Sequence, residues 1–299
     1  MVSKKAFTMI ELVMVIVILG IVASIGSDIV LSLYNNYLRS RTINTLESKT
    51  EIVLEQIAKR LQYRIKDSTI ARKADGSYRA LAGSDSTYSI IEWISYSNES
   101  LLSNPPGWSG FIDLNDGNTT RPNLKTHDSN LSFASETMSA LTDGDINLTV
   151  EGKEAALIFR TPYNAENFGW GNGNVNTLGV ATLRVTKNNT DDDILIINAT
   201  DVPNDIYEHY VLAHSAYAIV PEGNITGTDF NLTLHYNYQP WIAARNNYAL
   251  GSTATLAEHV SLFQFKQDDT LIRLKLCIHD NNETGTGDRI AICKEKVVY

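Results

Sequence analysis

The chain has 299 residues, of which 43% are hydrophobic and 20% charged, and its formal net charge is −9. These proportions are typical of a folded protein and exclude a chain that is disordered over most of its length. An acidic surface repels phosphate, so a nucleic-acid-binding function is disfavoured and no nucleic acid partner is expected.

An apolar segment from residue 7 to residue 25 follows Lys4 and Lys5 and contains one charge, Glu11. As a helix, these roughly 19 residues would cover about 28 Å, close to the hydrocarbon thickness of a bilayer. The segment can therefore span a membrane, and the lysine pair predicts a cytoplasmic N-terminus. Glu11 is unexpected there, because a carboxylate within a spanning helix costs roughly 2.5–3.5 kcal/mol on insertion scales.

The run Lys4-Lys5-Ala6 followed by Phe7-Thr8-Met9-Ile10-Glu11-Leu12 resembles the N-terminal motif of the type IV pilins and the pseudopilins of type II secretion. The resemblance implies that prepilin peptidase cleaves between Ala6 and Phe7 and that the new Phe7 amine is N-methylated. It also implies that Glu11 pairs with the N-terminal amine of a neighbouring subunit, since two buried opposite charges cost less together than apart. The family usually has glycine where this chain has Ala6.

Two other interpretations of this segment are a secretory signal peptide, with a weak cleavage site at residues 23–26, and a simple signal anchor. Neither accounts for Glu11 or for a phenylalanine directly after the basic residues. Gly20 and Gly26 indicate either close helix–helix approach or a point that stretches during assembly, and the sequence leaves both open.

The helix is predicted to run on to about residue 67, because residues 7–67 contain no proline and only two glycines. An apolar stripe recurs at spacings of four or seven on its polar second half: Leu46, Val53, Ile57, Leu61 and Ile65. We expect residues 1–6 to be the leader, 7–27 the transmembrane and filament-core helix, and 28–67 an amphipathic helix whose stripe packs on a sheet. A coiled coil is the alternative, but sustained heptads are absent.

Residues 68–299 are predicted to form a mainly antiparallel β domain. Turn signals interrupt residues 73–147, where only 88–96 reads as a strand. Further strands are predicted at 155–160, 180–185, 194–197, 210–220, 230–238, 260–265, 271–279 and 290–298. Residues 230–236 alternate strictly between apolar and polar, as in a half-buried strand. One long helix followed by antiparallel strands is an α+β fold, which the resemblance also implies.

Cys277 and Cys293 lie on the last two predicted strands. A hairpin that pairs them also places Lys275 opposite Glu295, so that opposite charges meet. Facing residues lie about 4.5–5.5 Å apart, which is within disulfide range. We expect a structural disulfide, with two buried thiols as the alternative.

The sequence contains no catalytic motif. Its six histidines are scattered, and neither His-Glu-x-x-His nor Gly-x-Ser-x-Gly occurs. No enzymatic activity, cofactor or metal ligand is therefore expected. Calcium in the oxygen-rich loop 280–288, or at the three aspartates of residues 191–193, is a lower-ranked alternative, because neither follows the EF-hand pattern.

Six asparagines have Ser or Thr two residues later and an acidic residue two residues earlier: Asn118, Asn130, Asn147, Asn224, Asn231 and Asn282. Composition alone would give roughly one such match. The pattern resembles the acidic-extended sequon of bacterial N-glycosylation, which acts on periplasmic proteins. The alternative is that Asp, Asn and Thr gather in turns.

These observations predict a structural subunit of a type IV pilus-like or pseudopilus filament, held in the bacterial inner membrane by one span with its C-terminal domain in the periplasm. The expected partners are other pilin or pseudopilin subunits and prepilin peptidase. The large β domain favours a minor subunit at or near the tip. A pilin-anchored adhesin or a module that binds a secreted substrate or surface ligand is the alternative, favoured if Trp108, Trp170 and Trp241 share an exposed face. An anchored enzyme ranks third.

Overall fold

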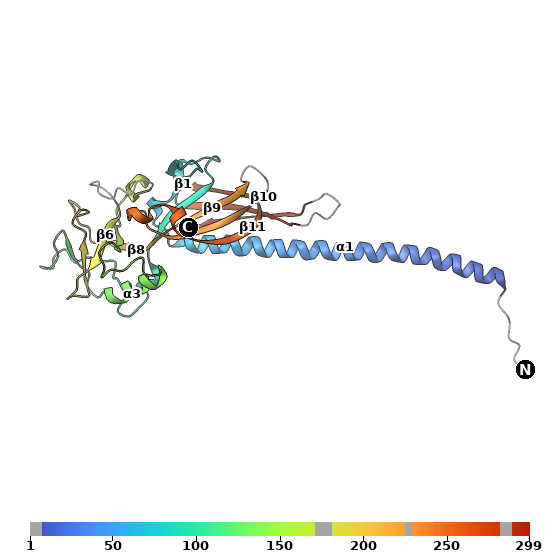
Figure 1. Ribbon diagram of the computed structural model, residues 1–299, viewed down its shortest axis with the longest axis horizontal. Coiled ribbons are helices and arrows are strands. Elements are labelled where there is room, and N and C mark those ends of the chain that lie inside the picture. Colours follow the sequence, from blue (N-terminus) through green and yellow to red (C-terminus); the bar gives the residue numbers. More distant parts are fainter. Residues whose placement is uncertain (1–7, 171–180, 225–228, 282–288) are drawn as a thin grey trace, which may run out of the picture.

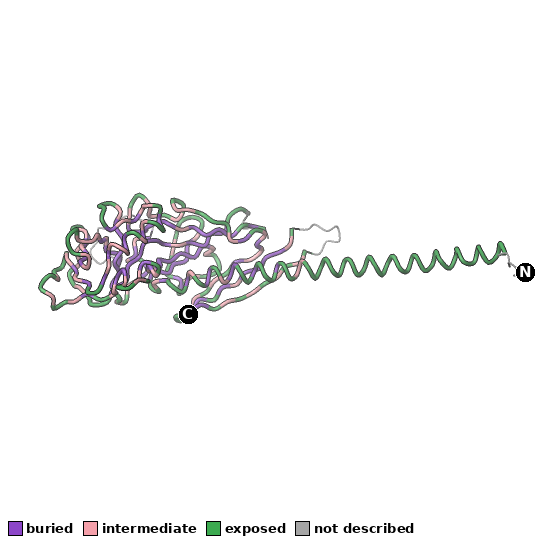
Figure 2. Tube along the Cα trace, turned by 90° about the horizontal axis from the view of Figure 1, so that it is seen from below, coloured by how far each residue is buried: buried purple, intermediate pink, exposed green. Residues whose placement is uncertain are grey.

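A single long helix projects from a β-rich head in the computed structural model, which describes residues 8–170, 181–224, 229–281 and 289–299 (Figure 1). The helix, α1 (Met9–Gln62), has 54 residues and is therefore about 80 Å long. All residues from 8 to 41 are exposed, whereas the second half of α1 lies against the head (Figure 2). A long N-terminal helix followed by antiparallel sheet confirms the predicted α+β class.

The main sheet has eight strands in the order β13-β12-β11-β10-β9-β3-β1-β2, and every neighbouring pair is antiparallel. Its strands are β1 (Ile70–Arg72), β2 (Tyr78–Ala80), β3 (Ile90–Ser95), β9 (Ser215–Asn224), β10 (Asp229–Tyr238), β11 (Ser252–Asp268), β12 (Leu271–His279) and β13 (Ala291–Val298). From β9 to β13 the chain runs as a meander in which each strand pairs with the next.

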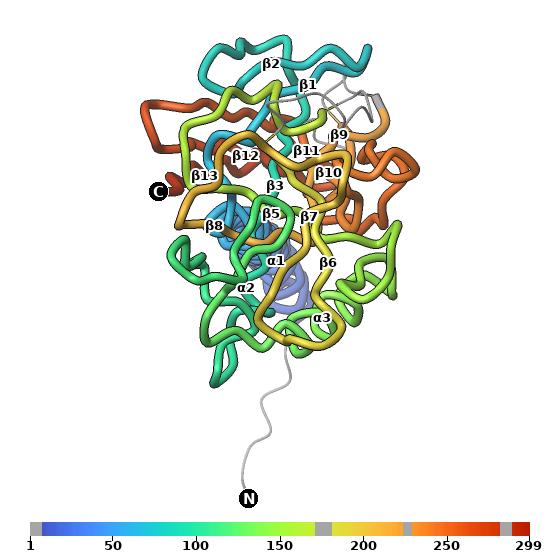
Figure 3. Tube along the Cα trace, turned by 90° about the vertical axis from the view of Figure 1, so that its left-hand side faces the viewer, coloured from blue at the N-terminus to red at the C-terminus, as the bar shows by residue number. Residues whose placement is uncertain are grey.

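The chain between β3 and β9 forms a second sheet of five strands, ordered β4-β7-β6-β5-β8. Its elements are α2 (Asn98–Leu101), β4 (Asn123–Lys125), α3 (Leu131–Leu141), β5 (Ala155–Phe159), β6 (Leu183–Lys187), β7 (Ile194–Ile197) and β8 (Tyr210–Ala213). Because Ser95 of β3 directly faces Ser215 of β9, residues 96–214 are an insertion between two paired strands. The insertion occupies the end of the head farthest from the N-terminus of α1 (Figure 1) and lies in front of α1 when viewed from that end (Figure 3).

Short 3₁₀ helices complete the described elements: Lys66–Ser68, Leu81–Gly83, Ala165–Phe168, Ala243–Arg245 and Tyr248–Leu250.

The apolar stripe of α1 packs on the main sheet, as predicted. Its buried residues are Leu46, Thr50, Val53, Leu54, Ile57, Ala58 and Leu61. The apolar members of this set share one core with the inward-facing residues of β12 and the end of β13, namely Ile272, Leu274, Leu276, Ile278 and Val298. Each large apolar side chain buried in this way contributes about 1.5–3 kcal/mol.

α1 ends at Gln62 rather than at residue 67. Beyond it, the Ile65 amide donates to the Ile94 carbonyl at 2.8 Å, and the Tyr96 amide donates to the Tyr63 carbonyl at 3.0 Å. The chain therefore leaves the helix to pair with the end of β3, and Ile65 packs in the core of the insertion instead of the stripe. No local signal marks this exit, because its hydrogen-bond partners lie about thirty residues away in sequence.

Four further expectations about strands and helices need correction. The predicted strand 210–220 is two strands, β8 and β9, which meet at His214 and belong to different sheets. The predicted strand 260–265 is part of the 17-residue β11. Within residues 73–147, where only 88–96 was predicted as a strand, the structure also has β2, β4 and the helix α3. The strict alternation at 230–236 is not half-buried, because Thr233 and His235 are buried as well, at 3% and 5% exposure.

Trp108, Trp170 and Trp241 are core residues rather than an exposed surface, with at most 2% exposure each. Each indole N–H donates to a backbone carbonyl: Trp108 to Ser97 at 3.2 Å, Trp170 to Ser68 at 3.0 Å and Trp241 to Glu154 at 3.1 Å. A buried indole needs such an acceptor. The tryptophans therefore give no support to a ligand-binding face.

Candidate functional site

The N-terminus of α1 is closed by a reciprocal cap between Thr8 and Glu11. The Glu11 amide donates to Thr8 Oγ1 at 3.4 Å, and the Thr8 amide donates to Glu11 Oε2 at 3.2 Å. This is a capping box, in which each side chain satisfies a backbone donor of the helix end. The Glu11 carboxylate also lies where the helix dipole favours negative charge. No basic side chain pairs with Glu11 among the residues that the structure describes.

An uncovered apolar surface follows Glu11 along the first half of α1. Exposure reaches 87% at Met9, 60% at Leu19 and still 40% at Leu38. One 18-residue window has a mean hydropathy of 2.6, and by length and composition the helix can cross a membrane. Exposing an apolar patch of this size to water is unfavourable, so lipid or other helices are expected to cover this surface.

Gly20 and Gly26 lie on this surface with open space beside them, since no atom apart from the adjoining helix backbone lies within 4 Å of where a Cβ would stand. Both remain compatible with close helix–helix approach and with local stretching, the two roles that the sequence leaves open.

The second half of α1 is fastened to the C-terminal strand by ion pairs. Lys294 on β13 contacts Glu47 at 3.4 Å and Glu51 at 2.9 Å, and Lys296 contacts Glu55. The hydrogen bond from Lys294 lowers the pKa of the Glu51 carboxyl. Exposed pairs of this kind contribute little each, but they align the helix with β13.

Arg64, just after the end of α1, links the helix to the β-rich head. This residue is 7% exposed, and its guanidinium donates to the carbonyls of Leu61 at 2.8 Å, Tyr299 at 3.0 Å and Thr270 at 2.9 Å. Burial lowers the pKa of Arg64. Together with the buried stripe, these contacts make the head and the second half of α1 one packed unit.

A disulfide joins Cys277 and Cys293 across β12 and β13. The strands pair in the predicted register, with Lys275 opposite Glu295 and their charged groups 2.9 Å apart. The bond lies beside β11, where Ser261 Oγ donates to the Cys277 carbonyl at 3.4 Å. The expected structural disulfide is therefore present.

The candidate glycosylation asparagines lie in different environments. Asn118 and Asn231 are exposed. Asn130 caps α3 by accepting from the Phe133 amide at 3.0 Å, and the Asn147 side chain accepts from Ser135 Oγ at 3.1 Å. The Asn224 side chain and the whole of Asn282 lie outside the described residues. Glycosylation stays a prediction, with Asn118 as the most accessible acceptor in a turn.

The acidic segments considered for calcium differ in what the structure describes. Asp192 accepts from Lys187 Nζ at 3.0 Å and from the Ser132 amide, and Asp193 accepts from Lys125 at 2.6 Å. Their carboxylates thus have lysine partners. Most of the loop 280–288 lies outside the described residues, so the calcium alternative is not tested there.

Two histidine clusters form that the sequence does not reveal. Asp229 lies with His259 and His279, and Asp113 and Asp116 lie with His127. In the first cluster the residues are separated by twenty or more positions along the chain. Only the register of β10, β11 and β12 brings them together, which is why the histidines look scattered in the sequence.

Comparison with protein families matches residues 1–27 to the prokaryotic N-terminal methylation motif. The chain thus carries the N-terminus of a class of membrane-anchored precursors with one N-terminal apolar helix. Together with the length of α1, the motif fits the type IV pilins and pseudopilins, a family of structural subunits rather than enzymes, and implies prepilin peptidase processing and assembly with other pilin subunits. Searches of curated proteins and of solved structures found no match. Ala6 and Phe7, the predicted cleavage residues, lie outside the described residues.

Proposed function

We propose that this protein is a structural subunit of a type IV pilus-like or pseudopilus filament. The observation that carries the proposal is the uncovered first half of α1: from residue 9 to residue 25 its exposed surface is mainly apolar, and its one charge is Glu11 near its start. In the membrane, lipid covers this surface, and in a filament the same surface is covered by other copies of the helix. The same helix therefore anchors the subunit in the membrane before assembly and packs against other subunits in the filament.

The proposed topology has residues 7–27 in the inner membrane, the N-terminus in the cytoplasm and residues 68–299 in the periplasm. Lys4 and Lys5 support this orientation through the positive-inside rule. The disulfide between Cys277 and Cys293 supports it independently, because disulfides persist in an oxidising compartment such as the periplasm.

Cleavage between Ala6 and Phe7 would make Glu11 the fifth residue of the mature chain. Its carboxylate would then lie close to a new amine at residue 7. Among helices packed side by side, the amine of one subunit can meet Glu11 of the next, and each buried charge lowers the cost of the other. Glu11 thus selects the axial register between neighbours.

A pair of substitutions separates this role of Glu11 from its capping role. Glu11→Gln keeps a side chain that can complete the capping box but removes the charge. Because breaking a buried ion pair costs about 3–5 kcal/mol, we expect incorporation into filaments to fall by more than about tenfold. Thr8→Ala keeps the charge and costs only about 1 kcal/mol of helix-end stability, so its incorporation should stay near the wild-type level.

The measurement is the ratio of this subunit in sheared filaments to that in membranes of the native host, determined by immunoblot for each variant. Wild-type incorporation of Glu11→Gln would contradict the proposal, and so would loss of incorporation in Thr8→Ala alone.

The position of the insertion supports a minor subunit at or near the tip. A subunit extracted from the membrane leads with the end of its head farthest from the N-terminus of α1, and the insertion occupies that end (Figure 1). A subunit within the shaft has an earlier-added neighbour at that end. The first subunit has none, so it can carry a bulky domain there.

A further inference from the structure

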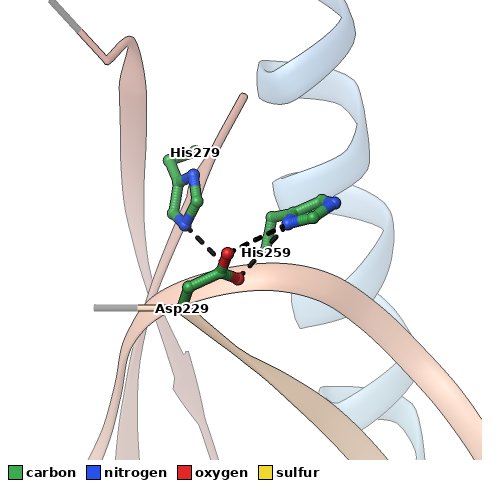
Figure 4. Close-up of side chains that lie close together, drawn as sticks. All are labelled: Asp229, His259 and His279. Atoms are coloured by element: carbon green, nitrogen blue, oxygen red, sulfur yellow. Dashed lines mark hydrogen bonds and ion pairs between the residues drawn. The ribbon is translucent and has the colours of Figure 1, made fainter. Parts of the chain in front are cut away.

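Three side chains from neighbouring strands converge on one point at the end of the main sheet nearest to the exposed half of α1. They are Asp229 at the start of β10, His259 in β11 and His279 at the end of β12 (Figure 4). Asp229 Oδ1 lies 3.2 Å from His259 Nδ1 and 3.6 Å from His279 Nε2. One ligand atom from each residue lies within 4.8 Å of the other two.

The hydrogen bonds of His279 leave one ring nitrogen unsatisfied. The ring is 4% exposed, and its Nδ1 lies 2.9 Å from the Asp280 carbonyl oxygen. A carbonyl only accepts, so Nδ1 carries the hydrogen and Nε2 of the neutral ring carries a lone pair. Nε2 is buried without a hydrogen-bond partner among the described residues. It lies 3.6 Å from Asp229 Oδ1, and in the neutral form of the ring both of these atoms are acceptors.

We propose that Asp229, His259 and His279 bind a divalent transition-metal ion, with Zn²⁺ as the best match. A cation between Nε2 and the carboxylate satisfies both acceptors. A metal-bound histidine also commonly donates its other N–H to a backbone carbonyl, as His279 does to Asp280.

The spacing of the ligand atoms fits a tetrahedral ion. With metal–ligand distances of about 2.0–2.2 Å, neighbouring ligand atoms in a tetrahedral zinc site stand about 3.3–3.6 Å apart. The separations from Asp229 Oδ1 to His259 Nδ1 and to His279 Nε2, 3.2 and 3.6 Å, lie close to this range, and the two histidine ligand atoms lie within 4.8 Å of each other. Two imidazoles and one carboxylate favour zinc-like ions over calcium or magnesium, which prefer oxygen ligands alone.

The backbone of β11 is shaped to present His259 to this point. Between Ala257 and Val260 the strand has one residue more than the facing part of β10. This bulge places His259 at a positive φ of 58°, which is uncommon for a residue with a side chain. Bulges redirect a side chain that regular pairing would point elsewhere.

A fourth ligand can reach the ion from the groove between α1 and the strands β11 and β12. This groove has a volume of about 800 Å³, and His259 and His279 both line it. Water can fill the open position. The bound ion would tie together the ends of β10, β11 and β12, whereas the disulfide joins only β12 to β13.

The test uses the full chain in detergent micelles, without a histidine tag, after removal of metals with EDTA. We expect isothermal titration with zinc sulfate to show one zinc per chain. Added zinc should raise the midpoint of thermal unfolding, because a ligand bound only to the folded state stabilises it. Calcium and magnesium should not. An unchanged midpoint with zinc would overturn the proposal and favour a plain Asp–His ion pair.

Variants locate the ion. His279→Gln and the exposed Asp229→Asn should each weaken zinc binding by about a hundredfold or more, since even outer-shell partners of a metal site cost 10–100-fold. Asp229→Asn keeps the test valid if His279→Gln fails to fold. The matched control His209→Gln, at an exposed histidine outside the cluster, should bind zinc like the wild type. Loss of binding in His127→Gln together with retention in His279→Gln would assign the ion to the second cluster and overturn the proposal.

Discussion

At the residue scale, a buried charged network links three strands of the main sheet. Glu92 of β3 is 1% exposed and is contacted by Arg72 of β1, and the Tyr238 hydroxyl donates to its carboxylate at 3.1 Å. Burial raises the pKa of Glu92, while the Arg72 charge opposes that rise. A carboxylate left alone in this position would cost several kcal/mol. The network therefore specifies how β1, β3 and β10 lie against one another, and we assign it no catalytic role.

His214, where the chain crosses from the insertion to the main sheet, predicts a pH dependence. It is 4% exposed, and burial lowers its pKa from 6.5 to about 4. The unfolded chain therefore binds a proton at a higher pH than the folded chain. Above pH 6.5 this group has no effect on folding, and below it the folded state loses up to about 3 kcal/mol as the pH falls towards 4.

We expect the stability advantage of wild type over His214→Leu to shrink by up to about 3 kcal/mol between pH 7 and pH 4. Urea unfolding of both proteins across this range measures it. The carboxylates titrate alike in the two chains, so their contribution cancels in the difference. Parallel pH profiles would contradict the prediction.

At the scale of elements, α1 is one helix with two environments. Its second half buries seven side chains against the head, and its first half buries none of its described residues. The first half must find its partners outside the chain. Besides this apolar packing, the hairpin of β12 and β13 holds α1 to the head through ion pairs. Lys294 and Lys296 on β13 pair with Glu51 and Glu55 of α1.

Removing the disulfide should loosen this hairpin. The cysteines are 16 positions apart, and closing a loop of that length stabilises a protein by roughly 3 kcal/mol. We expect Cys277→Ser combined with Cys293→Ser to lower the free energy of unfolding by about that amount in urea titrations. The neighbouring cross-strand pair is a matched control: Lys275→Gln should cost less than about 1 kcal/mol, because that ion pair is exposed. Equal losses in the two proteins would contradict the prediction.

At the scale of the whole molecule, the insertion makes the two ends of the protein unlike. One end is a bare apolar helix that packs among other helices, and the other is a folded domain built from residues 96–214. This polarity is why we place the subunit at or near the tip of a filament.

Labelling tests that position. An epitope inserted after Asn115, an exposed residue in a turn of the insertion, should bind gold-conjugated antibody at filament ends only. The control is the same epitope in a subunit that forms the shaft, which should label along the whole length. Gold spread along the shaft for this protein would contradict a tip position while leaving its role as a subunit intact.

Features encoded by neighbouring residues could be predicted from the sequence. The apolar run around Glu11, the stripe at Leu46 and Ile57, and the Cys277–Cys293 register each depend on periodicity or on a short hairpin. Local periodicity repeats a backbone geometry, so it identifies a helix face or a strand face directly.

Other features depended on contacts between distant parts of the chain. The end of α1 at Gln62, the division of residues 210–220 between two sheets at His214, the burial of Trp170 and the meeting of His259 with His279 have no local signature. In each case a hydrogen bond or packing partner far along the chain outweighs local preference, and such a partner leaves no pattern among neighbouring residues. The amino-acid order thus sets the helix, the anchor and the paired cysteines, and folding in three dimensions sets the insertion, the core and the histidine cluster.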